Sequence, residues 1–218
     1  MRTKILGLAA ALVITMTATA FGTGNTSALH PPAGHRMALV TFEDLECPAC
    51  AKAEPLLQQA ERNYGIPVVW HDFIIPSHAW SKEAAIMARY FDTQSAQLGN
   101  EFRAYIFTNQ RSIYKTNLRE WADKFAAEHH TALPAFYDPT GALRAKVEAD
   151  TQLGKETGET GVLHTPTIYV VSDNPRMPYV EVSDQGRLFE TIEQVKGALP
   201  KASASKPKKT TVARTAKD

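Results

Sequence analysis

The stretch FEDLECPAC, residues 42–50, decides the fold of this 218-residue chain. It holds the only two cysteines of the chain, Cys47 and Cys50, and it follows the apolar run MALVTF of residues 37–42. The apolar run has strand composition, and Pro48 suits the first turn of a helix, where a missing N–H has no intrahelical partner. We therefore expect the cysteine pair at a strand-to-helix junction.

Cysteines at this spacing and in this place favour thiol–disulfide exchange. The first sulfur would lie beside the unpaired N–H groups of a helix N-terminus, whose dipoles favour the thiolate. A lowered pKa makes Cys47 a ready nucleophile and a good leaving group, the two properties that exchange requires. Cys50, one turn deeper, would be the resolving partner.

Two other roles for the pair are disfavoured. A structural disulfide across four residues would contribute only about 2 kcal/mol, because stabilisation grows with the length of the closed loop. A zinc site needs four ligands, whereas the chain has one cysteine pair, and the adjacent His129 and His130 would point about 100° apart on a helix. We therefore expect redox chemistry without a metal or another bound cofactor.

The rest of the chain alternates between strand and helix patterns. The first helix is expected to run to about Tyr64 and to stop at Gly65. Residues 68–75 form an apolar run that predicts a strand buried on both faces. Four helices are expected next, at about 81–92, 95–108, 118–129 and 139–158. The remaining elements are two strands and a helix, at 167–171, 179–182 and about 187–199. The order predicts an α/β protein with an inserted helical subdomain.

Both ends of the chain are predicted to lie outside the folded body. An apolar run over residues 5–20 after a basic start is typical of a secretory signal, here residues 1–28 with cleavage after Ala20 or Ala28. A retained membrane anchor is the alternative, although the run is short for a span of about 20 residues. A signal places the mature chain in the periplasm or elsewhere outside the cytoplasm, where disulfides persist. Residues 201–218 have the composition of a basic disordered tail.

The charge distribution argues against binding to nucleic acid. The formal net charge of the chain is +1, but its basic residues are concentrated at the two ends. The body between the ends has 16 basic and 22 acidic residues, a net charge of −6. Such a body lacks the electrostatic character of a nucleic-acid-binding domain.

Several motifs resemble those of the DsbA-like thiol–disulfide oxidoreductases, which have a thioredoxin fold. FEDLECPAC resembles their active-site entry, and Pro55 matches the proline that kinks their active-site helix. WHDFIIP, residues 70–76, resembles their second strand and its exit into a helical insertion. GVLHTPT, residues 161–167, resembles the loop that carries their cis-proline. The resemblance covers about residues 37–199.

The resemblance implies an α/β architecture, a thioredoxin fold interrupted by an inserted α-helical subdomain. Its thioredoxin-fold parts would be residues 35–76 and 159–200, and the helical insertion would be residues 77–158. A cis bond at Pro166 would expose the backbone of Thr165 to an incoming peptide, which can pair with it as an added strand.

The resemblance also implies a function. An exported enzyme would catalyse disulfide formation in secreted proteins through a mixed disulfide at Cys47 that is resolved by Cys50. A redox partner, membrane-bound or soluble, would have to reset it. A disulfide reductase or isomerase would use the same residues, and a non-catalytic binding module of the cell envelope would use the same fold. The sequence leaves the substrates and the oligomeric state open.

One departure from the family pattern concerns proton transfer at the second cysteine. Six residues before the first cysteine the family has a buried acid, and this chain has Thr41 there. Glu43, Asp44 and Glu46 remain as candidates for that task. Glu46 would also raise the pKa of Cys47 if its carboxylate lay close to the sulfur.

A second departure concerns the histidines. Ala49 replaces the histidine that the namesake of the family has between its cysteines, which removes a cationic stabiliser of the thiolate. His164 replaces the glycine usual two residues before the cis-proline. It would either stabilise the thiolate from the other side of the site or face solvent as a loop residue. We therefore expect a milder oxidant than the namesake.

Overall fold

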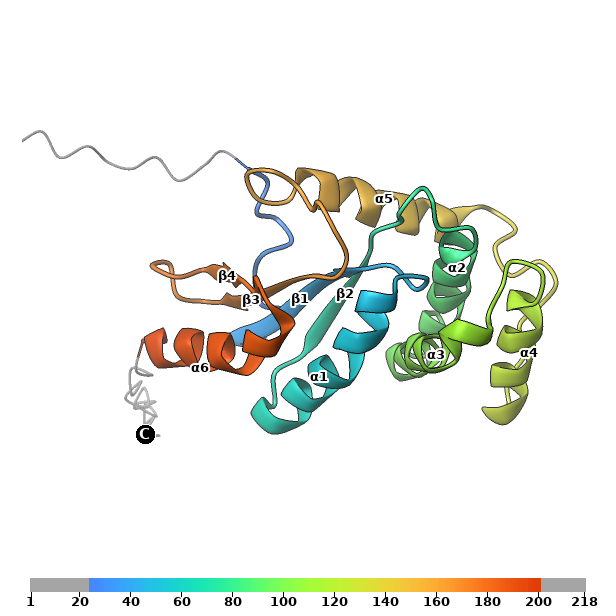
Figure 1. Cartoon of the computed structure of the whole chain (residues 1–218), viewed down its shortest axis with the longest axis horizontal. Coiled ribbons are helices and arrows are strands. Elements are labelled where there is room, and N and C mark those ends of the chain that lie inside the picture. Colours follow the sequence, from blue (N-terminus) through green and yellow to red (C-terminus); the bar gives the residue numbers. More distant parts are fainter. Residues whose placement is uncertain (1–23, 201–218) are drawn as a thin grey trace, which may run out of the picture.

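Figure 1 shows the chain as a computed structural model, which describes residues 24–200. The predicted tail, and the predicted signal apart from residues 24–28, lie outside the described residues. Within residues 24–200, no helix is both long enough and apolar enough to cross a membrane.

A four-stranded sheet with the order β2-β1-β3-β4 lies at the centre of the fold. β1 (Met37–Glu43) pairs in parallel with β2 (Val68–Asp72) and antiparallel with β3 (Thr167–Ser172). β4 (Tyr179–Glu181) pairs antiparallel with β3. Every residue of β1 is buried, because the strand has a neighbour on each side and helices over both faces.

The second strand differs from its prediction in length and burial. The apolar run of residues 68–75 predicts a strand buried on both faces, but β2 ends at Asp72 and its first four residues are only half-buried. β2 is an edge strand, so one of its sides has no neighbouring strand. Beyond its end, the N–H of Ile75 donates to the Asp44 carboxylate rather than to a strand.

Helices cover both faces of the sheet (Figure 1). α1 (Pro48–Tyr64) and α6 (Leu188–Ala198) pack on one face, and α5 (Ala142–Glu156) packs on the other. α5 approaches the sheet closely at Gly154, where a methyl group would lie 2.5 Å from the Phe73 ring. The close approach explains why this helix position holds a glycine.

The bounds of α1 agree with their prediction. Pro48 is the first helical residue, and Gly65 ends the helix in the left-handed conformation with a φ of 62°. The N–H of Gly65 donates to the carbonyl of Glu61, which satisfies one of the orphan carbonyls of the last turn. Pro55 lies inside the helix.

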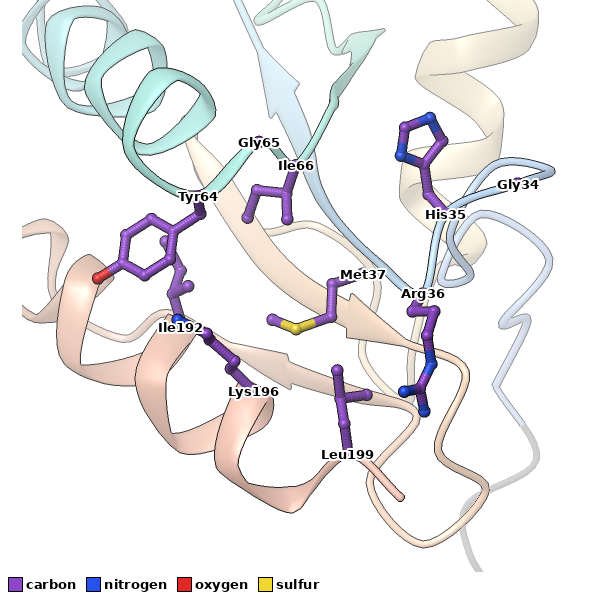
Figure 2. A pocket seen from close by; sticks show the side chains of 10 residues that line it. All are labelled: Gly34, His35, Arg36, Met37, Tyr64, Gly65, Ile66, Ile192, Lys196 and Leu199. Carbon is purple, nitrogen blue, oxygen red and sulfur yellow. The ribbon is translucent and has the colours of Figure 1, made fainter. Parts of the chain in front are cut away.

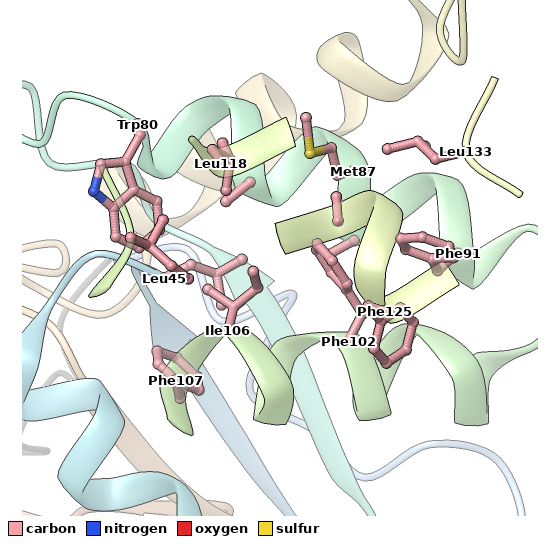
Figure 3. Packing of buried hydrophobic residues seen from close by; sticks show 14 of the residues in the cluster. Leu45, Trp80, Met87, Phe91, Phe102, Ile106, Phe107, Leu118, Phe125 and Leu133 are labelled. Atoms are coloured by element: carbon pink, nitrogen blue, oxygen red, sulfur yellow. The ribbon is translucent and has the colours of Figure 1, made fainter. Parts of the chain in front are cut away.

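The helices α2 (Ser81–Asp92), α3 (Ala96–Asn109) and α4 (Leu118–Glu128) pack together beside the sheet, within the predicted insertion. Figure 3 shows their shared apolar core, in which the rings of Phe91 and Phe102 lie 4.7 Å apart. Further aromatic residues are buried in this core or pack partly buried against it: Trp80, Tyr105, Phe107 and Trp121. Two short 3₁₀ helices, η1 (Gln110–Ser112) and η2 (Gln185–Arg187), follow α3 and precede α6.

Candidate active site

Cys47 and Cys50 lie at the start of α1, directly after the loop that leaves β1. Cys47 is the residue before the first helical position, and its carbonyl accepts hydrogen bonds from the N–H groups of Cys50 and Ala51 at 3.1 and 3.2 Å. Both residues are free thiols. Cys47 is 9% exposed and Cys50 is 2% exposed, so the first sulfur is the more accessible.

The two thiols have opposite pKa shifts. The pKa of Cys47 is lowered to about 5, chiefly because the Cys50 thiol donates a hydrogen bond to its sulfur. Hydrogen bonds from the Thr165 side chain and from backbone N–H groups lower the pKa further, whereas burial of the sulfur opposes the shift. Burial raises the pKa of Cys50 well above its usual value, and the negative charges of Cys47 and Glu43 raise it further. At neutral pH the site therefore holds a thiolate at Cys47 and a thiol at Cys50.

The loop before β3 faces Cys47. The bond between Thr165 and Pro166 is cis, as the motif predicts. The carbonyl oxygen of Thr165 lies 3.3 Å from the Sγ of Cys47, within reach of a hydrogen bond from the protonated thiol. The fold thus brings the cysteine pair, Cys47 and Cys50, together with Thr165 and Pro166, which lie more than a hundred positions later in the chain.

His164 has an exposed side chain. Its Nδ1 lies 3.5 Å from the hydroxyl of Thr167, and that hydroxyl donates to the His164 carbonyl at 2.7 Å. Within residues 24–200, no hydrogen bond joins the imidazole to either cysteine. This placement corresponds to the solvent-facing alternative, and a role in stabilising the thiolate stays a prediction.

The carboxylate of Glu46 is directed to the start of α2. Its Oε2 accepts hydrogen bonds from the N–H groups of Trp80 at 2.7 Å and Ser81 at 3.1 Å. A carboxylate in this position satisfies orphan donors of the helix and interacts favourably with its dipole. Glu46 thus links the active-site loop to the insertion.

Asp44 holds the same loop from its other side. Its carboxylate accepts hydrogen bonds from the N–H groups of Glu46 and Ile75, each at 2.8 Å, and lies 2.9 Å from the Nδ1 of His78. The N–H of Asp44 approaches the Sγ of Cys50 at 3.5 Å, which helps to offset the burial of that sulfur. Asp44 therefore fixes the loop with its side chain and contacts the second cysteine with its backbone.

Glu43 is the third of the candidate acids, and its side chain is buried. Residues alternate between the faces of a strand, so Glu43 lies on the same face of β1 as Leu39, which packs in the core under α1. The side chain is 3% exposed, and its Oε1 has no hydrogen-bond partner. Burial, followed by the nearby charge of Glu54, raises the pKa of Glu43 well above its usual value, while the buried Arg103 opposes the shift.

Two glutamines that the sequence did not single out hold the backbone of the cysteine motif. Gln110 in η1 donates from its Nε2 to the carbonyls of Leu45 at 2.9 Å and Cys47 at 3.1 Å. Gln185 in η2 donates to the carbonyl of Ala49 at 3.3 Å. Both glutamines are far from the motif in sequence, and no local pattern marks them.

The described residues offer no candidate metal centre. Between residues 24 and 200, no three or more His, Cys, Asp or Glu side chains are grouped so that they could hold a metal ion.

The fold and the site together define a class. A central sheet with the order β2-β1-β3-β4, helices on both faces, and a dithiol at the start of a helix opposite a cis-proline are the features of a thioredoxin-fold protein. A family profile described as thioredoxin matches residues 30–175. The chain belongs to this family.

Solved structures of DsbA-type proteins share the fold. A variant of alpha-DsbA1 from Wolbachia pipientis is 14% identical with a TM-score of 0.61, and the match covers 77% of this chain and 89% of that one. BdbD from Bacillus subtilis is 17% identical with a TM-score of 0.58, over 80% and 96% of the two chains. DsbA2 from Pseudomonas aeruginosa is 18% identical with a TM-score of 0.54, over 78% and 94%. No curated protein matches the sequence. The chain has the DsbA-like form of the thioredoxin fold.

Proposed function

We propose that this protein is an exported thiol–disulfide oxidoreductase that forms disulfides in secreted proteins. The observation that carries the proposal is a dithiol at the start of α1 opposite a cis-proline, in which the pKa of Cys47 is lowered to about 5 and the pKa of Cys50 is raised well above its usual value. The pair combines an exchangeable sulfur at the start of α1 with a buried partner one turn deeper. A structural disulfide has no need of such an asymmetry.

The stabilised thiolate supports the oxidising direction of exchange. Stabilising the Cys47 thiolate favours the reduced form, so the disulfide form readily accepts electrons from a substrate. The pKa of about 5 lies between the value of roughly 7 for thioredoxin, a reductant, and roughly 3.5 for DsbA, a strong oxidant. This supports an oxidase that is milder than DsbA, as the sequence predicts.

The proposed reaction begins with the Cys47–Cys50 disulfide. A substrate thiolate attacks the Sγ of Cys47, the S–S bond breaks, and Cys50 leaves as a thiolate that takes up a proton. A second substrate thiolate then attacks the substrate sulfur of the mixed disulfide, and Cys47 leaves as a thiolate. Two electrons pass from the substrate to the protein. In the opposite direction, Cys50 attacks the mixed disulfide and resolves it.

Glu43 supplies or accepts the proton of Cys50 in this proposal. The pKa of Glu43 is raised well above its usual value, so its carboxyl group holds a proton more readily than an exposed one, and its Oε1 has no hydrogen-bond partner. A negative charge on Glu43 raises the pKa of Cys50, so the ionised form of either group favours a proton on the other. Protonated Glu43 would neutralise the departing Cys50 thiolate, and the carboxylate would receive the proton when Cys50 attacks.

Substrate and partner contacts complete the proposal. The backbone of Thr165, beside Cys47, would pair with an extended substrate segment. A redox partner, membrane-bound or soluble, would reoxidise the dithiol. Export depends on the signal predicted over residues 1–28, whereas the chemistry depends only on residues that the structure describes.

The equilibrium redox potential of the Cys47–Cys50 pair against glutathione tests the proposal. A potential less negative than about −200 mV is expected for an oxidase, and a potential near about −270 mV would indicate a reductase instead. The same oxidised protein should restore activity to a reduced, unfolded test enzyme that requires disulfides. Failure to transfer its disulfide would favour the non-catalytic binding module.

A further inference from the structure

A cleft of about 380 Å³ opens beside Pro48, the residue that follows Cys47. Trp80 contributes to its wall from the start of α2, and Ile113 and Tyr114 contribute from the segment after η1. Figure 3 shows Trp80 at one end of the core cluster of the insertion. The volume lies within the range of about 300–1,000 Å³ that is usual for binding sites.

The cleft continues away from the cysteines along α2. A second cleft of about 360 Å³ shares Ala79, Trp80 and Lys115 with the first. A third, of about 210 Å³, shares Glu83 and Arg144 with the second and is lined by Phe136. We call these three adjoining clefts the insertion groove. It begins at the active-site motif and leads over the helical insertion.

Two of the exposed apolar side chains lie in the same groove. Within residues 24–200, the large apolar side chains that are mostly exposed are Tyr114 at 62%, Phe136 at 84% and Leu163 at 77%. Tyr114 and Phe136 line the insertion groove, and Leu163 lies two residues before Thr165. Single exposed apolar residues need no explanation, but two of these line the insertion groove and the third belongs to the loop of the cis-proline, which indicates an interaction surface.

The start of the groove carries an uncompensated positive charge. Arg111 and Lys115 line the first cleft, both are exposed, and neither forms an ion pair with any residue that the structure describes. Glu46 is the acid among the lining residues, and its Oε2 is already bound to two N–H groups of α2. The cations stand out on a body with a net charge of −6. Their field favours acidic partners.

We infer that the insertion groove binds the substrate polypeptide next to its reactive cysteine and selects segments in which aromatic side chains alternate with acidic ones. The aromatic side chains would lie in the clefts against Trp80 and Tyr114, and the acidic ones would contact Arg111 and Lys115. The inference rests on the proposed function, because the groove selects among substrates of the dithiol at its end.

Three peptides that differ only beside a single cysteine test the inference. One has Phe-Asp pairs on both sides of the cysteine, the second has Phe-Lys pairs, and the third has Ser-Ser pairs. The rate constant for attack of each peptide thiolate on the oxidised protein is measured by stopped-flow fluorescence at low salt and at a common thiolate concentration. The Phe-Asp peptide should react about five- to tenfold faster than the Phe-Lys peptide, and the difference should shrink with added salt.

Two variants and a control localise the effect. Lys115→Glu should remove or invert the preference for Phe-Asp over Phe-Lys, and Tyr114→Ala should reduce the advantage of Phe-Asp over Ser-Ser. Lys146→Glu makes the same charge change at an exposed residue of α5 that does not line the groove, and it should keep the wild-type ratios. The Tyr114 and Lys115 side chains are exposed, so folding should survive both substitutions.

The outcomes separate this inference from the proposed function. Equal rates for the three peptides, or identical ratios in Lys115→Glu and Lys146→Glu, would overturn the insertion groove as a selective site while leaving an active oxidoreductase. An oxidised protein that reacts with none of the peptides, and not with a small thiol, would refute the proposed function itself.

Discussion

The two ends of β1 bury different kinds of side chain. At the amino end, Met37 packs among apolar residues and lines a cleft of about 270 Å³ with Ile192 and Leu199 (Figure 2). At the carboxyl end, next to the cysteine motif, Thr41 and Glu43 each bury an oxygen that has no hydrogen-bond partner. The same strand thus runs from a conventional apolar core into a polar interior.

The two ends of β1 therefore contribute differently to stability and to thiol–disulfide exchange. A buried polar group without a partner costs roughly 1–3 kcal/mol, so the carboxyl end of β1 is held in place at the expense of stability. Proteins tolerate such a violation where function requires it. Changes at the carboxyl end should therefore alter exchange, and changes at the amino end should alter folding alone.

The largest effect is expected from the cysteines themselves. Cys47→Ser should abolish oxidation of a reduced test protein, because no other sulfur is accessible at the start of α1. Cys50→Ser should instead accumulate a mixed disulfide with a disulfide-bonded peptide, detectable by mass spectrometry without reductant. Equal trapping by both variants would contradict the distinct roles of the two residues.

The thiolate should make the stability of the reduced protein depend on pH. The pKa of Cys47 is about 5 in the folded protein and roughly 8.5 in an unfolded chain, so ionisation stabilises the folded reduced form fully above about pH 8.5. This contribution, a few kcal/mol at about 1.4 kcal/mol per pKa unit, should be lost as the pH falls toward 5. Thermal unfolding of the reduced and oxidised proteins between these pH values measures it. Reduced Cys47→Ser is the control, and a stability difference independent of pH in the wild type would exclude a stabilised thiolate.

Substitution of the buried acid should have a smaller effect on exchange. Glu43→Gln keeps the shape but removes the titrating proton, and it should slow resolution of a mixed disulfide by Cys50 about tenfold or more. Glu54→Gln makes the same change at a neighbouring buried carboxyl group whose Oε1 accepts from Gln58, and it should slow the step far less. Quenched-flow measurement of mixed-disulfide decay gives both rates.

The same substitution has a consequence for stability. The pKa of Glu43 is raised in the folded state, so the folded protein binds more protons than the unfolded chain above about pH 4.3, and stability falls as the pH rises from there to the folded pKa. Glu43→Gln should flatten that decline. An unaltered decline in stability, together with an unaltered rate at Cys50, would show that Glu43 is only a structural residue.

A substitution at the amino end of β1 should have the smallest effect on exchange. Met37→Ala removes a buried side chain at the edge of a cleft and should lower the free energy of unfolding by about 2 kcal/mol. The redox potential and the rate with small thiols should stay at wild-type values. A shifted potential in this variant would remove the distinction between the two ends of the strand.

The sequence predicted those features of the fold that depend on the conformational preferences of single residues. Pro48 and Gly65 bound α1 as expected, since the first tolerates a missing N–H and the second adopts a positive φ. The burial of β2 was predicted wrongly, because an apolar run does not reveal whether a strand lies at the edge of a sheet.

The candidate site was predictable to a similar extent. The cysteine pair and the cis-proline loop have motifs of their own, and Glu43 was one of three candidate acids. Choosing among the three required the structure, in which Asp44 and Glu46 accept hydrogen bonds from the backbone while an oxygen of Glu43 stays without a partner. No sequence pattern predicted the role of Gln110, because its contact with Cys47 joins residues 63 positions apart.

That contact of Gln110 bears on attempts to reduce the protein to a minimal unit. The amide binds the two carbonyls of Leu45 and Cys47 from the insertion, and Glu46 in the same loop binds the first turn of α2 in return. Excising residues 77–158 and rejoining the sheet would preserve every residue of the CPAC motif. The carbonyls of Leu45 and Cys47 and the carboxylate of Glu46 would nevertheless lose these partners. Transplanting the motif alone into a shorter thioredoxin scaffold would likewise transfer its residues without the hydrogen bonds that fix its backbone.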